Sequence, residues 1–141
     1  MAEGMSRNEQ VVRALSPLLG KTVAEARLSP LGGDWINISL GGALIWINMT
    51  AWLLESGSDF ILACEDALDY IHAMIAELDG RPLTSLDVSP LLDLTLDFNG
   101  IRLITFSTSS RADIKHWSVQ MTSGYTLFAG PGRSWSLEQT G

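Results

Sequence analysis

The sequence predicts an α+β domain made of two duplicated antiparallel β-meanders, with about four strands in each. Apolar and polar residues alternate over several short segments, as in half-buried strands. Glycine-containing dipeptides separate these segments at the spacing of hairpin turns. Two stretches, about 20–63 and 80–130, repeat one order of segments, and a helical segment over 65–78 joins them. We expect the meanders to form one bent sheet or a partial barrel.

The N-terminal segment of the domain is expected to be a helix. Residues 1–5 should form a loose tail ahead of a single domain over 6–138. Ser6 and Glu9 have the spacing of a capping box, in which the side chain of each residue bonds to the backbone N–H of the other. Pro17 disfavours helical geometry at the residue before it, so the helix should end near that point.

The first meander begins with loosely alternating residues over 21–29 and continues past a turn at Pro30–Gly33. Its clearest feature is the hairpin dipeptide Gly41-Gly42, because glycine reaches positive φ without strain. Apolar and polar residues alternate on both sides of this dipeptide, so one face of the hairpin should be buried. The remaining strands are expected over 36–40, 43–49, 51–55 and 60–63.

The central helix over 65–78 carries apolar residues at helical spacing and acidic residues in its first turns, where the helix dipole favours negative charge. Gly80 then provides a C-terminal stop. The second meander contains the strongest hairpin signal of the chain, Asn99-Gly100. Its strands are expected over 92–98, 101–106, 116–121 and 125–129, before Gly130-Pro131-Gly132 interrupts regular structure.

The two meanders share more than strand order. The first starts at Gly20-Lys21 and reaches Ser29-Pro30-Leu31, and the second starts at Gly80-Arg81 and reaches Ser89-Pro90-Leu91. A hairpin and then a tryptophan-led strand follow in both. Unrelated meanders converge on similar patterns, but the Ser-Pro pair at a matching offset favours an internal duplication.

Composition limits the classes of partner. The net charge is -7, and no cluster of Lys and Arg is present to replace phosphate counterions, so we expect no binding to nucleic acid or to anionic membranes. A basic protein partner is compatible with this charge, although the charge also serves solubility alone. Charged residues make up 18% of the chain, below the roughly 25% of typical domains. Some apolar surface is therefore available for a partner to cover.

The sequence predicts a cytoplasmic protein. Cys64 is its only cysteine, so no intramolecular disulfide forms. The first residues have neither the basic nor the apolar segment of a secretory signal.

Catalytic and metal-binding motifs are absent from the sequence, so we expect no catalytic residues, no metal ligands and no cofactor. His72 and His116 are the only histidines, and Asp69 precedes His72 by three residues. A carboxylate at that spacing orients an imidazole for base catalysis, but it also forms ordinary surface pairs on helices. Cys64 is interpreted as a small buried residue rather than a reactive thiol.

The candidate binding residues lie on the side of the strands that faces away from the apolar positions. Aromatic rings interleaved with amides can stack on a small ligand or anchor a protein interface. A helix covering this side of the sheet is the alternative, because α+β domains commonly pack helices there. The predicted ligand- or partner-binding residues are Trp35, Asn37, Trp46, Asn48 and Phe106. The second hairpin also places Asp97 opposite Arg102, which predicts a cross-strand ion pair.

The C-terminal run contains His116-Trp117, then Gly124 followed by Leu127, then Gly-Pro-Gly-Arg-Ser-Trp-Ser over 130–136 and Glu138. This run resembles the ending of a family of small, mostly bacterial, uncharacterised proteins with a Gly-Pro-Gly-x-Ser-Trp-Ser-x-Glu segment. The stretch Ile61–Asp66 and the Trp52–Glu55 strand are similar to it too. The resemblance implies an accessory or immunity-type protein that acts by binding, and it implies no activity and no site residues.

Three functional hypotheses follow. The first is a non-catalytic interaction protein that binds a protein partner or itself as a homodimer, using the face that carries Trp35 and Trp46. The second is a small-ligand-binding domain with a tryptophan-lined pocket between the meanders. The third is a hydrolase-like enzyme that uses His72 or His116 with nearby carboxylates.

Overall fold

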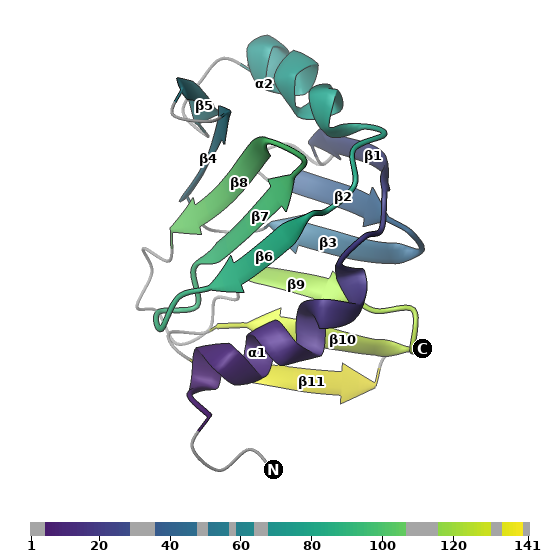
Figure 1. The fold of residues 1–141 in the computed structure, drawn as a ribbon, viewed down its shortest axis with the longest axis vertical. Coiled ribbons are helices and arrows are strands. Elements are labelled where there is room, and N and C mark those ends of the chain that lie inside the picture. Colours follow the sequence, from purple (N-terminus) through teal and green to yellow (C-terminus); the bar gives the residue numbers. More distant parts are fainter. Residues whose placement is uncertain are drawn as a thin grey trace.

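A computed structural model shows an α+β fold with two antiparallel sheets and two short helices (Figure 1). The structure describes residues 5–28, 36–47, 51–56, 59–63, 68–106, 116–130 and 134–139, with the backbone alone for 59–63, 68 and 72. The predicted α+β class is therefore confirmed. The strands form two separate sheets rather than one bent sheet, and each sheet takes strands from both halves of the chain.

The larger sheet has six strands in the order β1-β2-β3-β9-β10-β11, and the smaller one has five in the order β5-β4-β8-β7-β6. All neighbouring strands run antiparallel. The strands of the larger sheet are β1 (Val23–Leu28), β2 (Ile36–Leu40), β3 (Ala43–Ile47), β9 (Trp117–Gln120), β10 (Tyr125–Ala129) and β11 (Trp135–Gln139). Those of the smaller sheet are β4 (Ala51–Ser56), β5 (Asp59–Ala63), β6 (Ser85–Val88), β7 (Leu94–Phe98) and β8 (Ile101–Phe106).

Helix α1 spans Arg7–Leu15 and begins with the predicted capping box, in which Ser6 and Glu9 exchange hydrogen bonds. A short 3-10 turn, Ser16–Leu18, carries Pro17 in its first turn and ends the helix. Helix α2 spans Leu68–Ile75, and a second 3-10 turn over Ala76–Leu78 brings the chain to Gly80. The predicted helix over 65–78 therefore ends where expected, while residues 64–67 lie outside the described part.

The smaller sheet and α1 lie over the same face of the larger sheet, with the smaller sheet over β1–β3 and α1 over β10 and β11 (Figure 1). The apolar side chains of both sheets fill the space between these layers, as their alternating burial shows. The largest buried side chains are Trp52, Trp117 and Phe98. Burial of such side chains removes a large apolar area from water and supplies the main stabilisation.

Two hairpins follow the predicted turns. Gly41 and Gly42 have φ of 54° and 90°, and Asn99 and Gly100 have φ of 54° and 105°. Positive φ at both central positions matches the right-handed twist of the flanking strands. The strand expected over 92–98 begins only at Leu94, because Leu92 lies in a turn with φ of 66°. The chain after Gly130 also adds strand β11, which pattern analysis did not predict.

The two halves of the chain cross at a reciprocal contact. The Gly20 N–H donates to the Leu83 carbonyl at 2.8 Å, and the Gly80 N–H donates to the Val23 carbonyl at 2.8 Å. Residues 20 and 80 are thus the donors of two matching hydrogen bonds, and residues 83 and 23 are their acceptors in the other half of the chain. The helices repeat this arrangement, since α1 packs against β6 and α2 packs against β1.

Candidate interaction surface

The larger sheet has one face that no described helix or strand covers. Its other face packs against the smaller sheet and α1. Side chains alternate between the two faces, so the fully buried Ile45 and Ile47 point into the core while Trp46 points outward and is half-buried. We call this uncovered side the outer face of the larger sheet.

Strand pairing places five residues of the outer face in one row. Asn37 lies opposite Trp46, and Trp46 lies opposite Ser118 on β9. Ser118 lies opposite Phe128, which lies opposite Ser136 on β11. Side chains directly opposite each other on antiparallel strands have Cβ atoms about 4.5–5.5 Å apart, so they contact across the sheet. Ser118 is only 6% exposed, as expected for a small side chain between two large rings.

Leu44 extends this apolar surface along β3, because it lies two residues from Trp46 on the same side. Leu44, Trp46 and Phe128 are all half-buried. We define these three residues together with Asn37 and Ser118 as the aromatic face. It is an uncharged surface drawn from four strands and from both halves of the chain.

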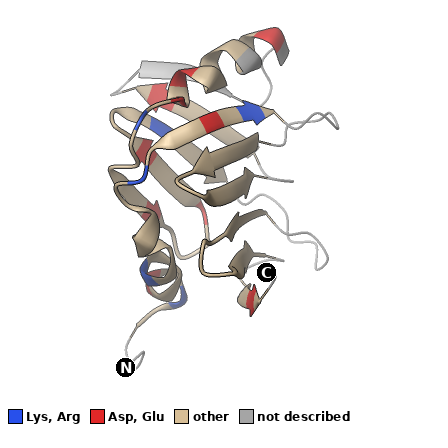
Figure 2. Cartoon of the chain, turned by 90° about the vertical axis from the view of Figure 1, so that its right-hand side faces the viewer, with Lys and Arg blue, Asp and Glu red and all other residues tan. Residues whose placement is uncertain are grey.

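Charged residues lie at the margins of the aromatic face. Arg27 on β1 lies opposite Asn37 and forms an exposed ion pair with Glu25. Glu138 lies on β11 at the other side of the sheet. In Figure 2 charged residues colour the helices, β1 and isolated positions on other strands, while long parts of the strands are uncharged. An uncharged centre with a charged rim is the usual composition of protein interfaces.

Asn37 contributes a polar group beside the Trp46 ring. Its side-chain oxygen is shielded from water and has no hydrogen-bond partner in the part of the chain that the structure describes. A buried acceptor without a donor costs about 1–3 kcal/mol. Asn37 is therefore a polar group of the aromatic face whose acceptor is unsatisfied within the described residues.

The structure brings together only part of the predicted set of binding residues. Asn37 and Trp46 are direct cross-strand neighbours. Phe106, which is 40% exposed, lies at the end of β8 in the smaller sheet, opposite Ala51. It therefore belongs to a different sheet from Trp46. Trp35 and Asn48 lie outside the described residues.

Sequence analysis did not identify Ser118 and Phe128 as members of the face. Their position depends on β9 pairing with β3, two strands that are about 70 residues apart in the sequence. Local periodicity carries no information on such pairing. The one local signal was the alternation of the apolar Trp117 and Val119 with the polar Ser118. This alternation predicts that Ser118 lies on the outer side of a strand, but it does not identify the strand that pairs with it.

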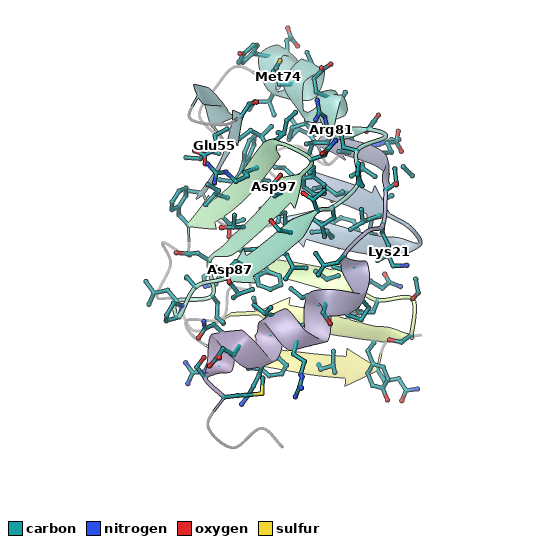
Figure 3. All side chains as sticks on the ribbon, viewed as in Figure 1. Lys21, Glu55, Met74, Arg81, Asp87 and Asp97 are labelled. Carbon is teal, nitrogen blue, oxygen red and sulfur yellow. The ribbon has the colours of Figure 1, made fainter. Side chains whose placement is uncertain are left out.

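The predicted pairing of Asp97 with Arg102 is confirmed as a strand register. Arg102 forms its ion pair with Glu55, which lies opposite it on the other side, on β4 (Figure 3). Asp97 accepts a hydrogen bond from the Gly100 N–H at 2.8 Å. The Asp97 carboxylate thus supports the Asn99-Gly100 turn, as aspartate commonly does at turns.

The histidines lie on different elements. His72 belongs to helix α2, whereas His116 immediately precedes β9 and is fully buried. Neither ring nitrogen of His116 has a hydrogen-bond partner among the described residues. Over the same described ranges, no group of three His, Cys, Asp or Glu side chains is placed to hold a metal ion. No described helix is long and apolar enough to cross a membrane.

A cavity of about 470 Å³ lies beside α1 and is lined by Asn8, Glu9 and Arg13 together with Asp87 of β6. It is open and mixed in charge, and it lies away from the aromatic face. The space between the two sheets is filled by buried side chains, including Trp52 and Trp117.

Comparison with family models, with curated proteins and with solved structures found no match to this chain.

Proposed function

We propose that this chain is a non-catalytic interaction protein that binds a protein partner through the aromatic face. The supporting observation is the row Asn37–Trp46–Ser118–Phe128, an uncharged aromatic surface on a sheet whose opposite face is already buried in the core. Half-buried tryptophan beside small polar residues is typical of the anchor positions that dominate binding energy.

The net charge of -7 supports a basic partner, because opposite charges accelerate encounter. The C-terminal resemblance supports an accessory or immunity-type role in a bacterial cytoplasm. The reciprocal bonds of Gly20 and Gly80 and the repeated Ser-Pro pairs support the finer proposal that the two halves arose by duplication.

The alternative of a small-ligand pocket between the meanders has less support. The described side chains between the two sheets are packed against one another, and the cavity beside α1 contains no tryptophan. The enzyme hypothesis has less support again, since His116 is fully buried on an element distinct from the helix that carries His72.

Site-specific photo-crosslinking tests the proposal in the cells that make the protein. A benzophenone amino acid placed at Leu44, next to Trp46, should give a discrete protein adduct that mass spectrometry identifies. The Trp46→Ala change in the same chain should reduce that adduct at least tenfold, because it removes the central ring. Leu91→Ala is the matched control, since Leu91 is 45% exposed in the turn between β6 and β7 of the smaller sheet.

An adduct of the same identity and yield in the Trp46→Ala chain would overturn the proposal. So would equal losses in the Trp46→Ala and Leu91→Ala chains, because the effect would then not belong to the aromatic face. Circular dichroism of both purified variants establishes that each is folded.

A further inference from the structure

The two sheets have four edges, and described segments contact three of them. The outer edge of β1 is bonded by the chain after the second 3-10 turn, with the Val23 N–H donating to the Arg81 carbonyl at 2.9 Å. At the edge of β6, the Asn8 side-chain amide of α1 donates to the Val88 carbonyl at 3.0 Å. Helix α2 packs against β5. Strand β11 is different, because no described segment lies on its outer side (Figure 1).

The hydrogen-bonding groups on the free edge of β11 follow from its pairing with β10. The Gly130 N–H donates to the Ser134 carbonyl at 2.7 Å, which makes these two residues a hydrogen-bonded pair. Such pairs alternate along an antiparallel ladder, so residues 136 and 138 also bond toward β10. The N–H and C=O groups of Trp135, Leu137 and Gln139 therefore point to the free edge.

The side chains of β11 protect this edge only through the single charge of Glu138. Natural edge strands are commonly blocked by lysine, by proline, by a bulge or by an inward-pointing charge. The five residues Trp135–Gln139 contain neither lysine nor proline, and their pairing with β10 is regular. The central residue, Leu137, is 49% exposed although it shares the side of Leu127 that faces the core.

We propose that a second copy of this chain pairs with the β11 edge, antiparallel and about a twofold axis at Leu137. In this register Leu137 lies opposite Leu137 of the second copy, as a hydrogen-bonded pair. Trp135 lies opposite Gln139 of the second copy, so all the edge-facing N–H and C=O groups find partners. The two exposed leucines cover each other, and the larger sheets join into one continuous sheet.

The charges of β11 permit a second copy in this register. Glu138 falls opposite Ser136 of the second copy, so the two Glu138 carboxylates do not face each other directly. Ser136 already donates to the Glu138 carboxylate within one chain, at 2.9 Å. The exposed Leu137 is self-complementary, as an isologous interface requires. This inference does not depend on the aromatic face, which lies on the side of the sheet rather than on its edge.

Light scattering across a concentration range tests the pairing. The wild-type chain of 15.3 kDa is expected to approach twice that mass as its concentration rises. Leu137→Pro removes an N–H that points to the free edge, and proline is tolerated at such positions. This variant should stay folded and monomeric. Ser136→Pro removes an N–H that bonds to β10, so it should instead lower the melting temperature.

Three further variants decide the outcome if Leu137→Pro fails to fold. Leu137→Lys places two positive charges opposite each other and should also be monomeric. Leu137→Cys should form a crosslinked dimer under a mild thiol oxidant such as diamide, whereas Gln139→Cys should not, since those two residues lie far apart across the axis. The wild-type chain, whose only cysteine is Cys64, is the control for crosslinking through that residue.

A wild-type chain that stays monomeric up to about millimolar concentration would overturn the inference. A dimer that persists in Leu137→Lys, or crosslinking equal at positions 137 and 139, would do the same. Trp46→Ala should leave the dimer mass unchanged, which separates this interface from the aromatic face. Because each copy carries -7, salt should strengthen the dimer, whereas salt should weaken binding to a basic partner.

Discussion

Leu92 shows how a single residue is held in a backbone conformation that leucine rarely adopts. Its φ is 66°, in the left-handed region that favours glycine. Its side chain is fully buried, and its carbonyl accepts a hydrogen bond from the Trp117 indole at 2.9 Å. Burial and this bond together offset the backbone strain, which is of order 1–3 kcal/mol. In the sequence, the similar segment Ser29-Pro30-Leu31 is followed by Gly32.

Trp117→Phe is expected to destabilise the fold by about 1–3 kcal/mol, because it leaves the buried Leu92 carbonyl without its donor. Urea unfolding followed by circular dichroism measures this loss. Trp46→Phe is the matched change on the outer face. The Trp46 indole donates no hydrogen bond to a buried acceptor among the described residues, so this change should cost less than about 1 kcal/mol. Equal losses in the two variants would contradict the role given to the Trp117 indole.

At the scale of elements, α1 is defined at its start by a reciprocal pair of bonds. The backbone N–H of Ser6 donates to the Glu9 carboxylate at 2.9 Å, and the Ser6 hydroxyl accepts from the Glu9 N–H at 3.3 Å. Hydrogen bonds from the Ser6 backbone and then from its hydroxyl hold the pKa of Glu9 below its usual value of 4.5. The ionised carboxylate is therefore the form that caps the helix.

The pKa of Glu9 is lower in the folded than in the unfolded state. The contribution of Glu9 to the stability of the fold is therefore fully present above about pH 4.5. It is lost as pH falls through the folded pKa. We expect Glu9→Gln to lower stability at pH 7 and to reduce the fall in stability between about pH 5 and pH 3. Thermal melts of both proteins over this pH range measure the effect. If the melting temperature of Glu9→Gln falls as steeply with decreasing pH as that of the wild type, this role is refuted.

At the scale of the whole molecule, the contact between the halves depends on two glycines in equivalent positions. Gly20 and Gly80 have φ of 87° and 83°, and a Cβ at either position would meet no atom within 4 Å. An alanine at either site would thus strain only the backbone. The two sites donate equivalent bonds, to Leu83 and to Val23.

Gly20→Ala and Gly80→Ala are expected to destabilise the protein by similar amounts, about 1–2 kcal/mol each, the usual cost of a left-handed conformation for a residue with a Cβ. Chemical denaturation measures both. A difference of more than about 1 kcal/mol between the variants would show that the two halves do not carry the contact equally.

Much of the fold was predictable from local patterns. The capping box at Ser6, the glycines at 41 and 42 and the Asn99-Gly100 dipeptide each specify a helix start or a turn through contacts within a few residues. Alternation of apolar residues also predicted which side of β2, β3, β7 and β8 is buried. The strand β11 was not predicted, although Trp135-Ser136-Leu137-Glu138 alternates apolar and polar residues, because this short segment directly follows the Gly-Pro-Gly stretch that interrupts regular structure.

The sequence by itself determined the fold class, the helices, the main hairpins and the outward position of Asn37 and Trp46. All of these depend on residues close together in the chain. Only the tertiary structure decided that β9 pairs with β3 and β4 with β8, so that each sheet combines both halves. This strand pairing places Phe128 and Trp46 on either side of Ser118, separates Phe106 from them, and leaves β11 at the edge of the larger sheet. Strand pairing over such distances depends on burying whole faces together, which local periodicity does not record.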